Sequence, residues 1–310
     1  MSGQVWNTSA LGGYMWSPNL SRKLRTALQP MVRYRQFCDA KEAFGLGIGD
    51  TFNWNIYSNV ATAGAALSET QIMPETNFTI TQASVKVVEY GNSVPFTKKL
   101  DDLSEHPVTE IIHKVLKNDA RQVLDLAAYA QFNATPLRIC ATSTATYTLT
   151  TNGTAFGTST VGDPTNTHVK LVADYMAEQN IPAFDGVNYL SVFRPAHLRQ
   201  LKNNLETIHQ YTPEGWHVIM NGEKGRYEGI RFIEQTNVPS LGWTSTGTDR
   251  GFFFGSDTVV EAFAIPEEIR GKIPSDYGRS RGVAWYAELA FGIVHTELPG
   301  TRIICWDSLA

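Results

Sequence analysis

Apolar residues recur at helical spacing between residues 104 and 132, and this pattern predicts one long helix. The apolar positions are Val108, Ile111, Ile112, Val115, Leu116, Val123, Leu124, Ala127 and Ala130. Ser104 suits the N-cap, and Glu105 and Pro107 suit the first turn. About 25 residues, each adding about 1.5 Å, predict a rod on the order of 38 Å long, about twice the average globular helix. Because no catalytic motif adjoins this rod, the pattern favours an architectural role.

The segment before the helix, residues 45–100, alternates apolar and polar positions and predicts an extended two-stranded excursion. Strands are expected over residues 51–57 and 78–90. The loop between them, Asn59 to Thr76, is roughly 18 residues long, whereas hairpin loops usually have two to five. A loop of that length is best explained by contact with a partner surface.

The rest of the chain mixes strands and helices without regular βα alternation, which indicates an α+β fold. Helices are expected over residues 168–179 and from Pro195 through Leu205, and strands over 187–193, 226–233, 251–254 and 259–264. Residues 283–293 and 301–306 are expected to form a closing β pair around Pro299-Gly300. The Ser- and Thr-rich residues 141–167 suit a polar β-ribbon or a surface loop.

A short amphipathic helix is predicted near the N-terminus. It begins at Ser17-Pro18, places Leu20, Leu24 and Leu28 on one face, and ends at Pro30. A helix this short with one apolar face is not stable alone, so it has to bury that face against its own subunit or another.

Charge is unevenly distributed along the 310 residues. The chain is 42% hydrophobic and 18% charged, typical of a soluble globular protein with somewhat sparse charge. The net charge is −4, yet the first 38 residues hold five bases and no acid, which leaves −9 on the remainder. These bases either contact nucleic acid or a neighbouring copy, or only keep a flexible terminus solvated.

Localisation signals and paired cysteines are not recognisable in the sequence. There is no signal peptide, and no window approaches the ~20 apolar residues of a membrane span, so no membrane partner is predicted. Cys38, Cys140 and Cys305 lie far apart without CxxC spacing, which favours reduced thiols and cytoplasmic synthesis.

Motifs for catalysis, cofactors or metals are also not recognisable, so we predict no enzyme, no cofactor and no metal site. Gly45-Leu-Gly-Ile-Gly49 lacks the GK[ST] of a phosphate loop, and a strand follows it. His106 and His113 share one side of the long helix without an acidic third ligand. The carboxylate pairs Asp101-Asp102 and Glu267-Glu268 suit helix N-termini, the second pair opening a short helix after Pro266.

Two strings carry a resemblance to a known family. They are Gly225-Arg-Tyr-Glu-Gly-Ile-Arg-Phe-Ile-Glu-Gln-Thr-Asn-Val-Pro239 and Tyr90-Gly-Asn-Ser-Val-Pro-Phe-Thr-Lys98. With the order of elements, they resemble the major capsid proteins of tailed bacteriophages, which have the HK97-type fold. The resemblance implies an N-terminal arm at 1–44, an E-loop at 45–100, a P-domain with spine helix and β-ribbon at 101–167, an A-domain at 168–282, and strands returning to the P-domain at 283–310.

The resemblance also implies a function. The chain would self-assemble through pentamers and hexamers into an icosahedral head that encloses double-stranded DNA, and it would reside in the virion after synthesis in the host cytoplasm. Its partners would be other copies, a scaffolding protein, a portal protein, a possible decoration protein, and DNA bound non-specifically. The expected inter-subunit contacts are Leu20, Leu24, Leu28, Arg22 and Arg25 in the arm, and Gly64, Leu67, Glu69 and Ile72 in the E-loop.

One departure from the family pattern concerns cross-linking. The type member joins an E-loop lysine to a neighbour's asparagine, but Asn59 to Thr76 contains no lysine. The resemblance therefore implies a shell without covalent cross-links. Three alternatives stay open: an encapsulin-like nanocompartment shell, a soluble enzyme with an unrecognised site, and another phage structural protein such as a tail tube.

Overall fold

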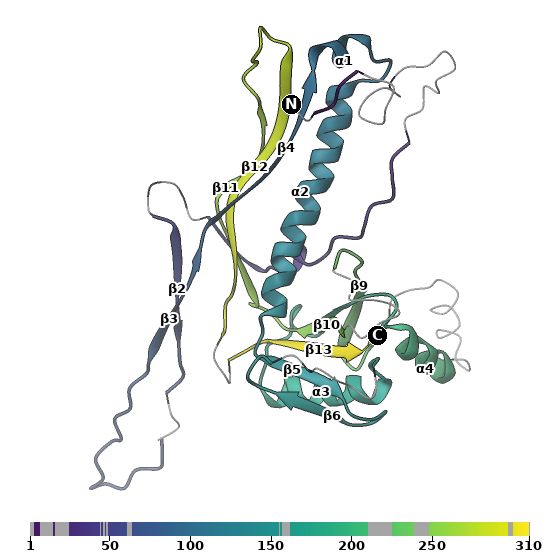
Figure 1. Ribbon diagram of the computed structural model, residues 1–310. Helices are drawn as coiled ribbons and strands as arrows, with labels where there is room; N and C mark the ends of the chain where they lie inside the picture. Colours follow the sequence, from purple (N-terminus) through teal and green to yellow (C-terminus); the bar gives the residue numbers. More distant parts are fainter. Residues whose placement is uncertain are drawn as a thin grey trace.

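The computed structural model of the chain describes residues 3–6, 15, 25–43, 45, 47, 49–60, 64–154, 156, 162–209, 225–238, 248–296 and 300–309. Figure 1 shows a long central helix, α2, flanked on one side by a tall sheet and at its lower end by a second sheet. A two-stranded hairpin, β2–β3, reaches away from both. This mixture of helices and strands agrees with the predicted α+β class.

The long helix is present but begins later than predicted. A short helix, α1 (Lys98–Leu103), comes first, and the Thr97 hydroxyl caps it by accepting from the Leu100 amide at 3.4 Å. The long helix α2 then covers Val108–Asn133. The predicted N-cap Ser104 is wrong, because Ser104 ends α1 and donates to the His106 carbonyl at 2.8 Å. Pro107 disfavours helical backbone at the residue before it, so the long helix starts only after the proline.

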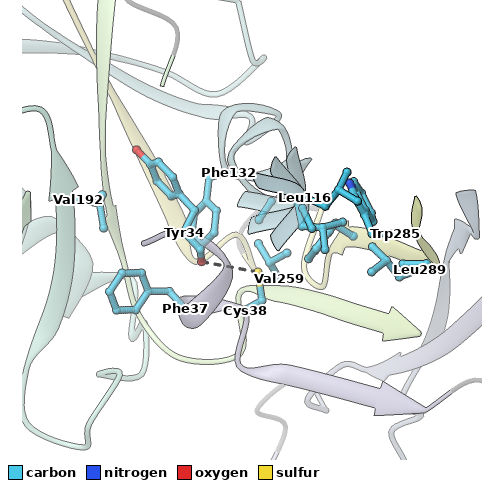
Figure 2. Packing of buried hydrophobic residues seen from close by; sticks show 14 of the residues in the cluster. Tyr34, Phe37, Cys38, Leu116, Phe132, Val192, Val259, Trp285 and Leu289 are labelled. Carbon is cyan, nitrogen blue, oxygen red and sulfur yellow. Dashed lines mark hydrogen bonds between the residues drawn. The ribbon is translucent and has the colours of Figure 1, made fainter. Parts of the chain in front are cut away.

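The tall sheet has the strand order β1-β11-β12-β4. Its strands are β1 (Ala40–Ala43), β11 (Val259–Gly271), β12 (Ser280–Ile293) and β4 (Val88–Thr97). One face packs on α2, and the buried side chains there include Leu116, Trp285 and Leu289 (Figure 2). The predicted short helix at Glu267-Glu268 is wrong, because β11 continues through both residues and Glu268 is in register with Tyr286 of β12.

The second sheet has the order β6-β5-β13-β10-β7-β9-β8. Its strands are β5 (Leu137–Ala141), β6 (Tyr147–Thr150), β7 (Tyr189–Phe193), β8 (Arg226–Tyr227), β9 (Ile230–Glu234), β10 (Thr248–Phe254) and β13 (Ile303–Leu309), and the helices α3 (Asn166–Glu178) and α4 (Arg199–His209) lie beside it. The expected strand 226–233 is two strands, because Glu228 and Gly229 form a two-residue turn with φ of 48° and 72°.

The predicted pairing of the last two strands is wrong. β12 pairs with β11 and β4 in the tall sheet, whereas β13 lies between β5 and β10 in the second sheet. Strand β13 is hydrogen-bonded along both edges, and Ile303 to Trp306 are buried on both faces. A strand buried on both faces loses the alternation that marks a half-buried hairpin, so its partners could not be inferred from its own pattern.

The hairpin consists of β2 (Thr51–Tyr57) and β3 (Ile80–Lys86), paired from Thr51↔Lys86 to Tyr57↔Ile80. Strand β2 has its predicted bounds. The single strand expected over 78–90 divides at Val87, whose amide donates to the Asp50 carbonyl at 2.8 Å. Before Val87 the chain pairs with β2, and after it β4 pairs with β12. The continuous apolar–polar pattern of residues 78–90 therefore belongs to two strands in two different sheets.

Candidate assembly surfaces

The base of the β2–β3 hairpin is fixed to the body by a tryptophan. The Trp54 indole donates from Nε1 to the Val294 carbonyl at 3.2 Å. A Cβ on Gly292 would come within 3.2 Å of the Trp54 ring and of Val85, so glycine at 292 permits the close contact between strand β12 and the hairpin. The hairpin therefore leaves the body in a set direction.

A cavity of about 470 Å³ lies at the same junction, between the hairpin base and the end of β12. Asp257 on its wall accepts a hydrogen bond from His295 at 2.8 Å and from Arg302 at 3.2 Å. The hydrogen bond from His295 is the main cause that lowers the pKa of Asp257. These contacts join the turn before β11 to the segments after β12, and they stiffen the corner from which the hairpin extends.

The distal part of the hairpin exposes apolar side chains. All four predicted contact residues, Gly64, Leu67, Glu69 and Ile72, are exposed, and Ile72 is 87% exposed to solvent. The sequence reasoning missed further exposed apolar side chains on the same hairpin, namely Tyr57, Val60, Met73, Phe78 and Ile80. Their signal in the sequence was a long loop rich in large apolar residues. An apolar surface of this extent on an isolated projection indicates a partner.

Residues 31–43 pack on the body of their own subunit, and three of their side chains enter its core. Tyr34, Phe37 and Cys38, in and around the 3-10 helix η2 (Arg35–Phe37), are buried against Phe132 of α2 and against Val192 and Val259 (Figure 2). Strand β1 then pairs in parallel with β11. This part of the expected arm is therefore a structural component of the subunit.

A buried carboxylate of α2 fastens this segment. Asp125 accepts from the Arg35 amide at 3.1 Å, from Gln235 at 2.6 Å and from Asn237 at 3.0 Å. Burial raises the pKa of Asp125, and these hydrogen bonds partly offset that effect. The Met31 amide adds a hydrogen bond to the Thr236 hydroxyl at 2.8 Å. The arm, α2 and the chain after β9 are thus joined by one polar network.

At least one basic residue of the arm contacts its own subunit. The sequence had left open whether these residues contact nucleic acid, contact a neighbouring copy or only solvate the terminus. Arg35 pairs with Glu261 at 2.6 Å and also contacts Glu267, both in β11. Arg25 and Leu28 are exposed, and residues 25–30 have no helical structure. The predicted helix through Leu28 is therefore wrong over that part, because Leu28 is fully exposed and does not bury its side chain against any of the described residues. Leu20, Arg22 and Leu24 lie outside the described residues.

Groups suited to chemistry are sparse in the described part of the chain. There, no group of three His, Cys, Asp or Glu side chains is placed to hold a metal ion. The three cysteines are buried as free thiols, and burial raises the pKa of Cys38 and Cys305, which makes them poor nucleophiles. No helix among the described residues is long and apolar enough to cross a membrane.

Comparisons with known proteins point to one class. The sequence model of a family described as phage capsid protein matches residues 80–300. Structural similarity covers nearly the whole chain. The capsid of the cyanophage P-SCSP1u matches with a TM-score of 0.69 at 12% identity, covering 96% of this chain and 94% of that one. The head of the Helicobacter pylori bacteriophage KHP40 matches with a TM-score of 0.67 at 12% identity, covering 94% and 96%.

A third match is the capsid of Ralstonia phage GP4, with a TM-score of 0.64 at 15% identity, covering 95% of this chain and 94% of that one. A search of curated proteins found no match. At these identities the structural likeness establishes the fold, and the family model establishes the sequence relationship.

Proposed function

The chain belongs to the phage capsid protein family, and from this premise we propose that it is a major capsid protein that assembles through pentamers and hexamers into a closed icosahedral head. A capsid protein of this family is a shell component with a structural role. Its HK97-type fold is shared with the capsid structures that it matches. Closed shells built from one chain need a surface on each subunit that binds a different surface on the next.

The observation that carries the proposal is the exposed apolar surface of the β2–β3 hairpin. Leu67, Ile72 and Met73 are solvent-exposed in the subunit, although burying each of them would be favourable. A neighbouring subunit beneath the hairpin would bury them. Since Trp54 fixes the hairpin base to the body, the contact would have the same direction in every subunit, as a ring of five or six requires.

The absence of lysine from the loop supports a shell without covalent cross-links. Residues 58–79 contain Glu69 and Glu75 but no lysine, and Lys86 at the hairpin base is paired with Asp50 at 2.9 Å. Cohesion would then come from many modest contacts acting together in the lattice. A decoration protein could add further contacts on the outer surface.

The remaining partners follow from the role of a phage head. The shell would enclose double-stranded DNA bound non-specifically, in the virion, after synthesis in the host cytoplasm. Assembly would use a separate scaffolding protein and a portal protein. The arm contacts proposed are Leu20, Leu24, Leu28, Arg22 and Arg25, and the hairpin contacts are Gly64, Leu67, Glu69 and Ile72.

The domain division also stays a proposal. We place the arm at 1–44, the E-loop at 45–100, the P-domain at 101–167, the A-domain at 168–282 and the return strands at 283–310. The sheet topology bears on the boundaries at 167/168 and 282/283. Strands β5 and β6 of the proposed P-domain and β13 of the return strands are hydrogen-bonded into the sheet that also contains β7, β9 and β10 of the proposed A-domain.

Electron microscopy of the purified chain, alone and with co-expressed scaffolding candidates, tests the proposal. Shells or capsomer rings are expected. Two variants probe the interfaces: Leu24→Asp in the arm, and Gly64→Pro with Glu69→Lys in the hairpin. Both should yield folded subunits that assemble poorly. Normal shells from both variants would contradict the assignment of arm and hairpin to interfaces.

A further inference from the structure

Three grooves on the surface of the subunit adjoin one another through shared arginines. Arg33 lines the first groove with Arg226 and Arg231 of the β8–β9 hairpin. Arg33 also lines the second groove, together with Arg121 of α2. Arg121 in turn lines the third groove. Each groove therefore shares a lining residue with the next along the arm and α2, and the third is also lined by Glu267 and Glu268 of β11. We name the bases of these grooves the basic track, which consists of Arg33, Lys114, Lys117, Arg121, Arg226 and Arg231.

Most of this positive charge has no ion-pair partner in the part of the chain that the structure describes. Within the described ranges, no ion pair involves Arg33, Lys114, Lys117 or Arg121. Such a set of unpaired cations on one surface attracts a polyanion.

The remaining two bases of the track are only partly compensated. Arg226 and Arg231 are directly opposite each other in the β8–β9 ladder, an arrangement that is unfavourable for like charges. Arg226 donates to the neutral amide oxygen of Asn188 at 3.1 Å, and Arg231 is 3.7 Å from Asp185. An anion bound beside this hairpin would relieve the repulsion.

Three of the bases form a regular stripe on α2. Lys114, Lys117 and Arg121 follow spacings of three and four residues, which place them on one side of the helix. All three are exposed, whereas Leu116 and Ala120 between them face the tall sheet. The stripe spans about 10 Å along the helix axis, long enough to contact several phosphates of a duplex.

The tall sheet has one face covered by α2 and one face turned away from it. Trp285 of β12 and Asn92 of β4 both donate to Asp119 of α2, so these residues define the face covered by the helix. By strand alternation Glu288 and its register partner Glu89 lie on the other face. Arg270, stacked on the Tyr286 ring, shares that face, so the face is mixed in charge. The basic stripe of α2 and Glu89 therefore lie on opposite sides of the layer made of α2 and this sheet.

We propose that the basic track lies on the inner wall of the shell and contacts the phosphate backbone of packaged double-stranded DNA. This inference rests on the proposed capsid function and specifies which face of the subunit meets the genome. The first two grooves are lined by cations, by one acid, Asp185, by apolar residues such as Met31 and Ile233, and by five amide side chains, namely Gln29, Gln36, Asn118, Gln122 and Asn188. Cations and amides are the groups that contact phosphate without reading sequence, whereas protein partners are usually held by buried apolar or aromatic anchors.

Binding of unassembled subunits to a duplex of random sequence tests the contact. The track variant carries Arg33→Gln, Lys114→Gln, Lys117→Gln and Arg121→Gln. A control variant with the same charge change, on α1, α3 and the β11–β12 tip, carries Lys99→Gln, Lys170→Gln, Lys272→Gln and Arg279→Gln. Affinity is measured by fluorescence anisotropy over a range of salt concentrations. Each lost phosphate contact lowers the slope of log K against log salt by about 0.9.

The track variant should lose up to about 3–4 units of that slope and bind about tenfold more weakly or worse, while the control changes little. Equal losses in both variants would show that only net charge matters and would overturn the proposal. So would native subunits that bind an acidic polypeptide, such as polyglutamate, through the track but bind no duplex.

Orientation is tested in assembled shells, and the native cysteines do not interfere because all three are buried. Lys117→Cys and Glu89→Cys are treated with a bulky maleimide before and after dissociation of the shells. The Lys117→Cys variant should react with the maleimide only after the shells dissociate, because residue 117 faces the interior. The Glu89→Cys variant should not become reactive through exposure of the inner wall, because residue 89 lies on the other side of the layer. Rapid labelling at 117 in intact shells would overturn the inference, but the shells themselves would keep the capsid function. Failure of the native chain to form any shell would instead refute the proposed function.

Discussion

Ile72→Asp separates the stability of the subunit from its assembly. Ile72 keeps 87% of its surface in solvent, so its replacement removes almost no buried surface from the folded subunit. The free energy of unfolding should change by no more than about 0.5 kcal/mol. In a shell that buries Ile72, the loss of an isoleucine side chain costs about 1.5–3 kcal/mol at each contact. The buried carboxylate adds a desolvation cost, and every subunit of the lattice pays both.

Urea denaturation of the subunit, followed by circular dichroism, measures the first quantity, and sedimentation velocity with electron microscopy measures the second. We expect a native unfolding midpoint and few or no shells. Ile72→Val is the matched control, because it keeps an apolar side chain and should assemble. Native assembly of Ile72→Asp would refute the placement of this loop in an interface. A large loss of subunit stability would show instead that the loop packs on its own body.

Three further predictions concern the subunit itself. Asp307→Ala removes the acidic partner of the buried Arg138 at 3.1 Å and of Arg250 at 3.3 Å, so urea denaturation should show a loss of about 3–5 kcal/mol; a loss below about 1 kcal/mol would contradict the buried ion pairs. Leu116→Ala should cost about 2–5 kcal/mol because Leu116 is fully buried, whereas the half-buried Val123→Ala should cost clearly less, and equal losses would contradict the packing of α2. Burial lowers the pKa of His168 below 6.5, so its protonation favours the unfolded state and stability should fall as pH drops through that value. The fall should be shallower in His168→Gln, and identical pH profiles of native and variant would argue against a buried neutral imidazole.

The apolar–polar periodicity of the sequence was enough to predict elements whose bounds do not depend on which strand or helix they pack against. Strand β2 alternates apolar and polar residues and has its predicted bounds, and α2 follows from the repeat of apolar residues around Leu116. The start of α2 was placed at Ser104, because Ser104 and Thr97 are both good caps and the sequence does not decide which helix each one begins. The break at Val87 was missed because it is defined by two sheets that the strand pattern alone does not distinguish.

The candidate surfaces likewise combine features that the local sequence predicts with contacts between distant residues that it does not. The loop with Leu67 and Ile72 was identified from its length, and both side chains are exposed. The anchoring of that hairpin by Trp54 against Gly292 was not predictable, because these residues are far apart in sequence and meet only in the fold. The internal pairing of Arg35 was not predictable for the same reason, since its partner Glu261 lies on a distant strand.

Hydrogen–deuterium exchange of residues 64–79 in free subunits and in assembled particles tests the central claim most directly. Among the described residues, the backbone of this loop forms few hydrogen bonds: the Gln71 amide donates to the Ser68 carbonyl at 3.0 Å, the Ser68 amide to the Gln71 side chain at 3.4 Å, and Thr79 exchanges hydrogen bonds with Ser58 at the end of the loop. We predict fast exchange in free subunits and marked protection in shells, where a neighbouring copy covers the loop. Strong protection in a monodisperse monomer, or equally fast exchange in both forms, would contradict the account.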